Sequence, residues 1–531
     1  MKKLITAWVV LILVAFAAPF AQSGAAPDIR LVLLIAVDQF RYDYLTRFRS
    51  DYSGGLAKLL TGGAVFTDAN LEHYPTVTAI GHATMLTGAT PSVSGIIGND
   101  WYDRESGTTV TSVSDLSVEP LGSPTKPAAS PHRLLVSTVG DQLKMASPHA
   151  KGTPGAPLVY GVSLKDRSAI MPAGRGANGA FWFDTKNGRF VTSTYYMAEE
   201  PAWLAAFNDR KRADVYAGRS WSPLNPPASV LKVMPSEPGP ALYEAVFGSP
   251  YGLDELLAFA TELLQREPLG RRNATDLLSV SFSSNDSVGH TFGPDSVHVR
   301  DMAIRVDRTI GQLLAEVDRL VGLSHVVVAL TADHGVAPLP EVARAQGLPG
   351  GRMTTKELFG PIEQALAAKF GAGKWILSTA GSSPYLNYEL IDAQKIDVKD
   401  VRRVAAEAAM TVPHVTRVYT RDQLMAGAVP NDRIGSRILR GFNAQRSGDL
   451  EIILEPFWIR QATGTTHGTP YNYDAHIPLI LMGPRIRPGE YNNPVALNDL
   501  APTLATLVQV EIPSGSVGRV LTEAIEPRVR K

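Results

Sequence analysis

The sequence of 531 residues contains no cysteine, and its 51 basic residues balance its 51 acidic residues. The lack of cysteine excludes disulfides, thiolate metal sites and a lipid-modified cysteine anchor, so any metal must be bound by histidine and carboxylate groups. Basic residues form no long run, and the sequence gives no support to a nucleic-acid partner. The remaining composition is that of an ordinary globular protein with enough length for several lobes.

Long apolar runs are also scarce. The run over residues 4–20 follows Lys2 and Lys3 and precedes small residues, which is typical of a signal peptide over residues 1–25. We interpret it as a cleaved signal, because its 17 residues lie at the lower limit for spanning a bilayer. Export without cysteine predicts a bacterial periplasmic or secreted protein with no stable membrane anchor after cleavage.

Four short apolar runs predict buried strands of a parallel sheet. They cover residues 31–37, 277–283, 326–330 and 477–482. Apolar residues spaced along one face over 302–317 predict a helix. This alternation predicts an α/β fold with helices on both faces of the sheet.

Two intervals do not follow the alternation. We expect residues 26–531 to form one catalytic domain in which insertions at about 100–250 and 340–460 cap the ligand-binding edge of the sheet. The second insertion contains a predicted helix over 401–410 and strand-like segments around 385–390 and 449–454.

Acidic or imidazole side chains follow three of the predicted strands. They are Asp38 after the first strand, Asp286 and His290 after the second, and Asp333 and His334 after the third. Ligands of open α/β sheets bind beyond the carboxyl ends of the strands, so these side chains should meet at one edge. A loop could bring His467 back to the same edge. Three Asp and three His suit zinc with positions left for water and substrate, although the same ligands also accept manganese, cobalt or iron.

The candidate nucleophile is Thr78, which follows Pro75-Thr76-Val77 at or near the start of a helix expected over 79–86. A threonine at this position is also a favoured helix cap. A helix N-terminus attracts anions, and a bound metal lowers the pKa of a hydroxyl. The local sequence alone leaves both interpretations open.

Taken together, the motifs resemble the alkaline phosphatase superfamily, and within it the nucleotide pyrophosphatase/phosphodiesterase branch and its bacterial phosphate-irrepressible alkaline phosphatase relatives. In family order they are Pro75-Thr76-Val77-Thr78, Asn99, Asp286 with His290, Asp333-His334-Gly335 and Thr466-His467-Gly468. The resemblance implies an alkaline-phosphatase-like, mostly parallel central sheet with helices on both faces.

It also implies two Zn²⁺ ions per chain. One would be bound by Asp286, His290 and His467, and the other by Asp38, Asp333, His334 and the Thr78 oxygen. Thr78 would attack phosphorus and form a phospho-threonine intermediate, while Asn99 would donate a hydrogen bond to a phosphoryl oxygen.

The segment 162–168 bears on the choice between monoesters and diesters. If it is extended, Lys165 and Arg167 point the same way and Asp166 points away, although a solvated charged turn is the simpler interpretation of these residues alone. In the phosphate-irrepressible phosphatases, which this segment resembles, the Lys and Arg contact the monoester phosphate. We therefore predict a monomeric alkaline phosphatase that hydrolyses small-molecule phosphate monoesters.

The main alternative is a nucleotide pyrophosphatase/phosphodiesterase that uses the same two metals and has a nucleotide-stacking pocket in place of the Lys165 and Arg167 contact. A sulfatase is disfavoured, because Thr78 stands where that branch needs a modified cysteine or serine. A metal-dependent phosphoglycerate mutase normally uses serine in the cytoplasm, and a binding protein without chemistry should have lost part of the motif set. For His82 and His476 we expect packing or supporting roles.

Overall fold

The computed structural model describes residues 28–123, 128–225, 229–380 and 383–527. The predicted signal peptide lies outside the described residues. Within those ranges, no helix combines the length and the apolar character needed to cross a bilayer.

The centre of the molecule is a sheet of ten strands in the order β21-β2-β20-β13-β1-β12-β7-β8-β9-β6. Its middle strands are β1 (Leu31–Val37), β12 (Asp276–Phe282) and β13 (Val326–Thr331), which run parallel and are completely buried. Their register places Val37 beside Phe282 and Ala36 beside Thr331, so the three strands end at the same level. This common end is the edge at which the sequence predicts the site.

The fourth predicted strand has the opposite direction from the one expected. It is β20 (Leu479–Met482), which pairs antiparallel with β13 and with β2 (Ala64–Phe66). The loop that carries His467 already lies at the carboxyl edge of the central strands, so the strand that follows this loop must run back. On the far side of β2, β21 (Gly489–Tyr491) pairs parallel with it.

Part of the first expected insertion belongs to the central sheet, which corrects the expected cap over 100–250. The sheet continues through β7 (Val159–Ser163), β8 (Gly179–Asp184), β9 (Arg189–Ser193) and β6 (Pro120–Leu121). The aromatic side chains of this region are core residues. The rings of Phe181 and Phe190 lie 5.4 and 4.0 Å from the ring of Phe259, centroid to centroid.

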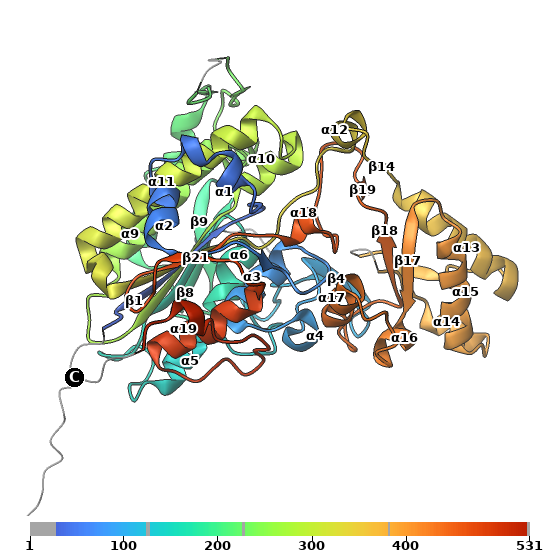
Figure 1. The fold of residues 1–531 in the computed structure, drawn as a ribbon. Coiled ribbons are helices and arrows are strands. Elements are labelled where there is room, and N and C mark those ends of the chain that lie inside the picture. Colours follow the sequence, from blue (N-terminus) through green and yellow to red (C-terminus); the bar gives the residue numbers. More distant parts are fainter. Residues whose placement is uncertain (1–27, 124–127, 226–228, 381–382, 528–531) are drawn as a thin grey trace, which may run out of the picture.

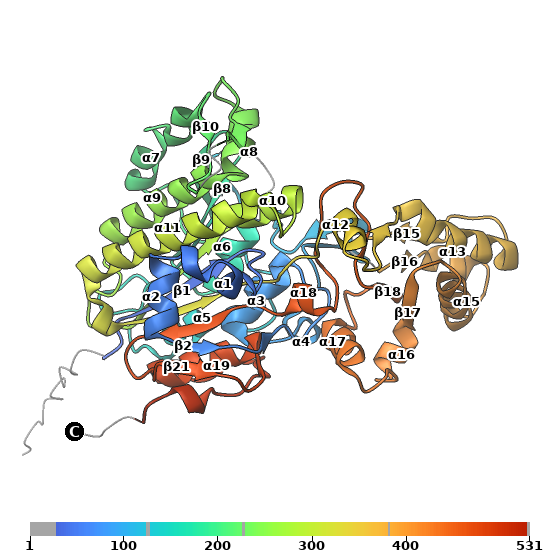
Figure 2. The same cartoon turned by 45° about the horizontal axis from the view of Figure 1, so that its top comes forward.

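Helices cover both faces of the sheet, as predicted (Figures 1 and 2). One face carries α2 (Gly55–Gly62), α9 (Pro250–Arg266) and α11 (Val297–Val321), and α11 contains the helical pattern seen in the sequence. The other face carries α3 (Thr78–Thr87), α5 (Val139–Ala146), α6 (Asp166–Ala173) and α19 (Leu500–Val508).

A second lobe stands beside the sheet and is orange in Figure 1. It includes α13 (Thr355–Phe370), α15 (Val398–Met410), β17 (Val415–Thr420) and β18 (Leu450–Leu454), which share an apolar cluster separate from the main core. The helix expected at 401–410 and the strand expected at 449–454 are therefore present. The strand expected at 385–390 stops at β16 (Tyr385–Leu386), because the Asn387 side chain caps α14 (Tyr388–Ala393).

Candidate active site

Three buried carboxylates come together where β1, β12 and β13 end. Asp38 follows β1 directly, Asp333 lies two residues beyond β13, and Asp286 lies in the first turn of α10 (Ser284–Phe292). The Asp38 and Asp333 side chains have no exposure to solvent, and that of Asp286 is about 8% exposed. Because the parallel strands end at the same level, their terminal carboxylates lie together in a buried site. The concentrated negative charge of this site needs compensating cations.

Three histidines direct their Nε2 atoms toward these carboxylates. The Nδ1 atoms of His290, His334 and His467 lie 2.7, 2.9 and 2.8 Å from the carbonyl oxygens of Thr465, Gly335 and Thr76. A carbonyl only accepts, so each Nδ1 donates and each Nε2 is left with its lone pair. This arrangement, in which a backbone acceptor fixes the tautomer of the ring, is the usual support of metal-binding histidines.

The ligand atoms lie in two groups that share His334. Asp38, Asp333 and His334 each offer one ligand atom within 4.8 Å of the others, and so do Asp286, His334 and His467. His290 joins the second group through its Nε2, which lies 3.2 Å from Asp286 Oδ1. The six Asp and His side chains predicted as metal ligands are therefore brought together.

The electrostatics of the site also fit bound cations. Burial and the Asp333 carboxylate raise the pKa of Asp38 well above its ordinary value. Burial, together with neighbouring imidazoles, lowers the pKa of His467 well below its ordinary value, so this ring is neutral, as a metal ligand must be. Asp38 Oδ1 and Asp333 Oδ2 are buried and receive no hydrogen bond from any described residue. Together with the histidine nitrogens they form an oxygen–nitrogen donor set, which suits zinc.

Thr78 lies beside both groups, at the start of α3. Its Oγ1 is 3.3 Å from His334 Nε2, and the residue is about 1% exposed. Val77 occupies the cap position, and Thr78 is the first helical residue. Its hydroxyl is thus not used as a cap, which removes the purely structural explanation for the residue.

Asn99 is oriented by the first turn of the same helix. Its Oδ1 accepts a hydrogen bond of 2.9 Å from the backbone N–H of Ala79. This contact fixes the amide group and leaves its Nδ2 as the donor. Asn99 therefore contacts the residue that follows Thr78, and its expected contact with a phosphoryl group stays a prediction.

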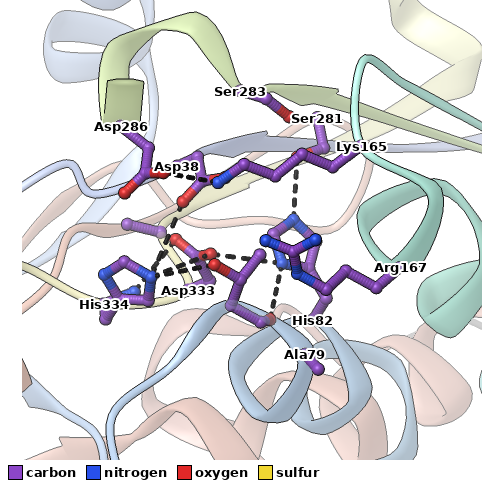
Figure 3. Close-up of polar contacts among 12 residues, drawn as sticks. Asp38, Ala79, His82, Lys165, Arg167, Ser281, Ser283, Asp286, Asp333 and His334 are labelled. Atoms are coloured by element: carbon purple, nitrogen blue, oxygen red, sulfur yellow. Dashed lines mark hydrogen bonds and ion pairs between the residues drawn. The ribbon is translucent and has the colours of Figure 1, made fainter. Parts of the chain in front are cut away.

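Lys165 and Arg167 lie at the start of helix α6. Lys165 is extended and occupies the N-cap position of α6, whereas Arg167 is inside the helix, so segment 162–168 is neither extended throughout nor a simple charged turn, the two interpretations that the sequence left open. Asp166 stands in the first turn, where a helix favours an acidic residue. Both basic side chains nevertheless extend toward the site (Figure 3). Lys165 Nζ lies 2.6 Å from Asp38 Oδ2 and 2.5 Å from Asp286 Oδ2.

Two residues support the site: Gln39, which the sequence did not single out, and His82, for which a packing or supporting role was expected. Gln39 donates its backbone N–H to Asp333 Oδ1 (3.1 Å) and its side-chain Nε2 to Asp286 Oδ1 (2.6 Å), which links the two metal-ligand groups. Both ring nitrogens of His82 are occupied, by Thr78 O and Ser281 Oγ, so His82 supports the site and does not bind metal. The only signal for Gln39 was its position directly after Asp38.

Comparison with known proteins agrees with this geometry. A family described as "type I phosphodiesterase / nucleotide pyrophosphatase" matches residues 32–472. The chain belongs to this family. Within the type I phosphodiesterase / nucleotide pyrophosphatase family, it is similar over nearly its full length to proteins that carry phosphatase names.

The alkaline phosphatase PafA of Elizabethkingia meningoseptica is 36% identical over 95% of this chain and 96% of its own. A crystal structure of PafA has a TM-score of 0.87 and covers 94% of this chain and 99% of its own, at 35% identity. A Myroides odoratus protein named a calcium-transporting ATPase is 35% identical over 94% of this chain and 95% of its own. The mostly parallel, mixed α/β fold and the homology to alkaline phosphatases are thus established.

Proposed function

We propose that this protein is a metal-dependent alkaline phosphatase that hydrolyses small-molecule phosphate monoesters through a phospho-threonine intermediate on Thr78. The observation that carries the proposal is the position of the Thr78 hydroxyl, which lies 3.3 Å from His334 Nε2 between a helix N-terminus and two groups of metal ligands. The names of its full-length relatives support the same reaction.

The donor set favours two zinc ions. One is assigned to Asp286, His290 and His467, and the other to Asp38, Asp333, His334 and Thr78 Oγ1. When bound, the two ions neutralise phosphoryl oxygens and stabilise both the attacking and the leaving oxygen of an in-line displacement.

The residues of the chain have separate tasks in the reaction. Thr78 Oγ1 forms a bond to phosphorus as the bond to the alcohol oxygen breaks, and water later cleaves the threonine ester. Asn99 Nδ2 donates to a phosphoryl oxygen, because its Oδ1 is already engaged by Ala79. Gln39 and His82 hold the carboxylates and the start of α3 in place and do not contact the substrate.

The preference for monoesters rests on Lys165 and Arg167. A monoester is a dianion with three unesterified oxygens, whereas a diester carries a second organic group in place of one of them. The two cations at the start of α6 favour the dianion by charge. The Arg167 side chain is about 25% exposed, so its guanidinium group is accessible to a phosphate. We further propose that residues 26–531 act as a periplasmic or secreted monomer after removal of the signal peptide.

The proposal is tested by trapping the intermediate. Purified protein is mixed with p-nitrophenyl phosphate, quenched in acid and digested, and the mass of the peptide that contains Thr78 is measured. We expect phosphate on Thr78 and loss of turnover in Thr78→Ala, whereas Thr61→Ala, which alters an exposed hydroxyl at the end of α2, leaves turnover unchanged. Turnover that survives both Thr78→Ala and thorough chelation contradicts the mechanism, and faster hydrolysis of bis-p-nitrophenyl phosphate contradicts the monoester assignment.

A further inference from the structure

A cavity of about 620 Å³ opens between the catalytic edge and the second lobe. Asn99, His290 and His467 line one end, where the phosphoryl group is handled. Ser383 and Glu451 line the wall that belongs to the second lobe. A volume of this size accommodates a small organic molecule. The cavity therefore gives the alcohol part of a phosphate ester at the catalytic edge room to extend toward the second lobe.

Glu451 is the acidic group of this wall, and its carboxyl oxygens have few hydrogen-bond donors among the described residues. It lies on β18, and Ser383 Oγ is the one hydrogen-bond donor to its carboxyl group among the described residues, at 3.1 Å from Oε1. Ser383 Oγ is closer to Leu450 O, at 2.7 Å, so its single proton serves that carbonyl first. Glu451 therefore keeps acceptor capacity that faces the cavity.

A carboxyl group in such a place is expensive for the protein. Burial raises the pKa of Glu451 to about 7, and the contact with Ser383 offsets this effect only in part. An apolar residue would fill the same wall without this cost. A carboxyl group in a cleft whose pKa is strongly perturbed is a candidate for a binding site.

We propose that Glu451 and Ser383 form a subsite for the alcohol portion of the substrate, which selects leaving groups that carry hydroxyl or ammonium donors. This inference rests on the proposed monoesterase function. A carboxylate accepts hydrogen bonds from either kind of donor, and its charge additionally attracts an ammonium group. The same charge disfavours leaving groups that carry further anionic groups.

The test compares pairs of substrates that differ in their donors. Glucose 6-phosphate is paired with cyclohexylmethyl phosphate, and 6-aminohexyl phosphate with hexyl phosphate. kcat/KM is measured for the wild type and for Glu451→Gln and Glu451→Leu. Glu455→Gln is the matched control, because Glu455 follows the same strand but is hydrogen-bonded to His414 and is about 44% exposed.

We expect Glu451→Leu to lower kcat/KM about tenfold for both donor-bearing substrates and less than twofold for their partners. Glu451→Gln should lower kcat/KM more for the ammonium substrate than for the sugar phosphate, because the amide keeps an acceptor but loses the negative charge. Equal losses on all four substrates, or no change in Glu451→Leu, overturn the subsite. If the wild type hydrolyses diesters and none of these monoesters, the proposed function fails instead, and the two failures are distinguishable.

Discussion

Glu451→Gln is expected to stabilise the protein most strongly at alkaline pH. In the folded protein the pKa of Glu451 is about 7, against an ordinary value of 4.5. The folded state therefore binds the proton more tightly than the unfolded state, and stability falls as pH rises from 4.5 to 7. At about 1.4 kcal/mol for each pH unit, the loss is about 1 kcal/mol at pH 5 and reaches about 3 kcal/mol above pH 7. Glutamine is neutral throughout and avoids this loss.

The expected change can be measured as a melting temperature. An unfolding entropy of about 2.1 cal/mol/K for each residue gives about 1.1 kcal/mol/K for a chain of this length. Glu451→Gln should therefore melt about 3 °C above the wild type at pH 8.5 and about 1 °C above it at pH 5 in differential scanning calorimetry. Glu455→Gln should show no such trend. A difference between Glu451→Gln and the wild type that is constant over this pH range refutes the reasoning, because Glu451 would then titrate normally.

Three further predictions concern the catalytic end. Replacing Lys165 and Arg167 together by alanine should lower the turnover of p-nitrophenyl phosphate far more than that of bis-p-nitrophenyl phosphate, and equal losses contradict their role. Asn99→Ala should lower kcat/KM for monoesters about 10²- to 10³-fold, the usual effect of removing one donor to a developing charge, and a loss below tenfold argues against its contact with phosphate. Chelation should lower the melting temperature, because Asp38 and Asp333 then lie close together without a bound metal ion. Added Zn²⁺ should restore the melting temperature, and a melting temperature that does not change with chelator contradicts the metal assignment.

Much of the fold was accessible from the sequence because the central strands are short, fully apolar and followed by polar residues. The expected limits of the strand at 31–37 match β1, and those of the next two central strands differ from β12 and β13 by one residue. The direction of the strand at 477–482 could not be predicted, because an apolar run does not indicate at which edge of the sheet the strand begins. The strands β7 to β9 were missed because aromatic, glycine-rich segments are equally typical of loops.

The ligands of the site were accessible for a related reason. Metal binding restricts the residue types, and adjacent parallel strands bring residues at their ends together whatever the intervening sequence. Lys165 is a residue for which such reasoning was not sufficient. The family resemblance implies that Lys165 contacts the phosphate, but the backbone conformation of Lys165 depends on Asp166 starting a helix, which the short charged segment 162–168 did not reveal.

The sequence predicted that the insertion at 340–460 caps the ligand-binding edge, but it did not indicate which residues of the second lobe contact the loops of the site. Helix α17 (Arg433–Gly441) of this lobe carries Arg437, whose carbonyl accepts the Tyr74 N–H at 3.1 Å and whose Nη1 donates to Pro470 O at 2.6 Å. Tyr74 begins the loop that leads to the nucleophile, and Pro470 lies in the loop of His467. A side chain built on Gly441 would come within 1.6 Å of the Tyr74 carbonyl oxygen, so close approach of the backbones requires glycine there. The same lobe that provides Glu451 therefore also contacts the loop that leads to Thr78 and the loop that carries His467.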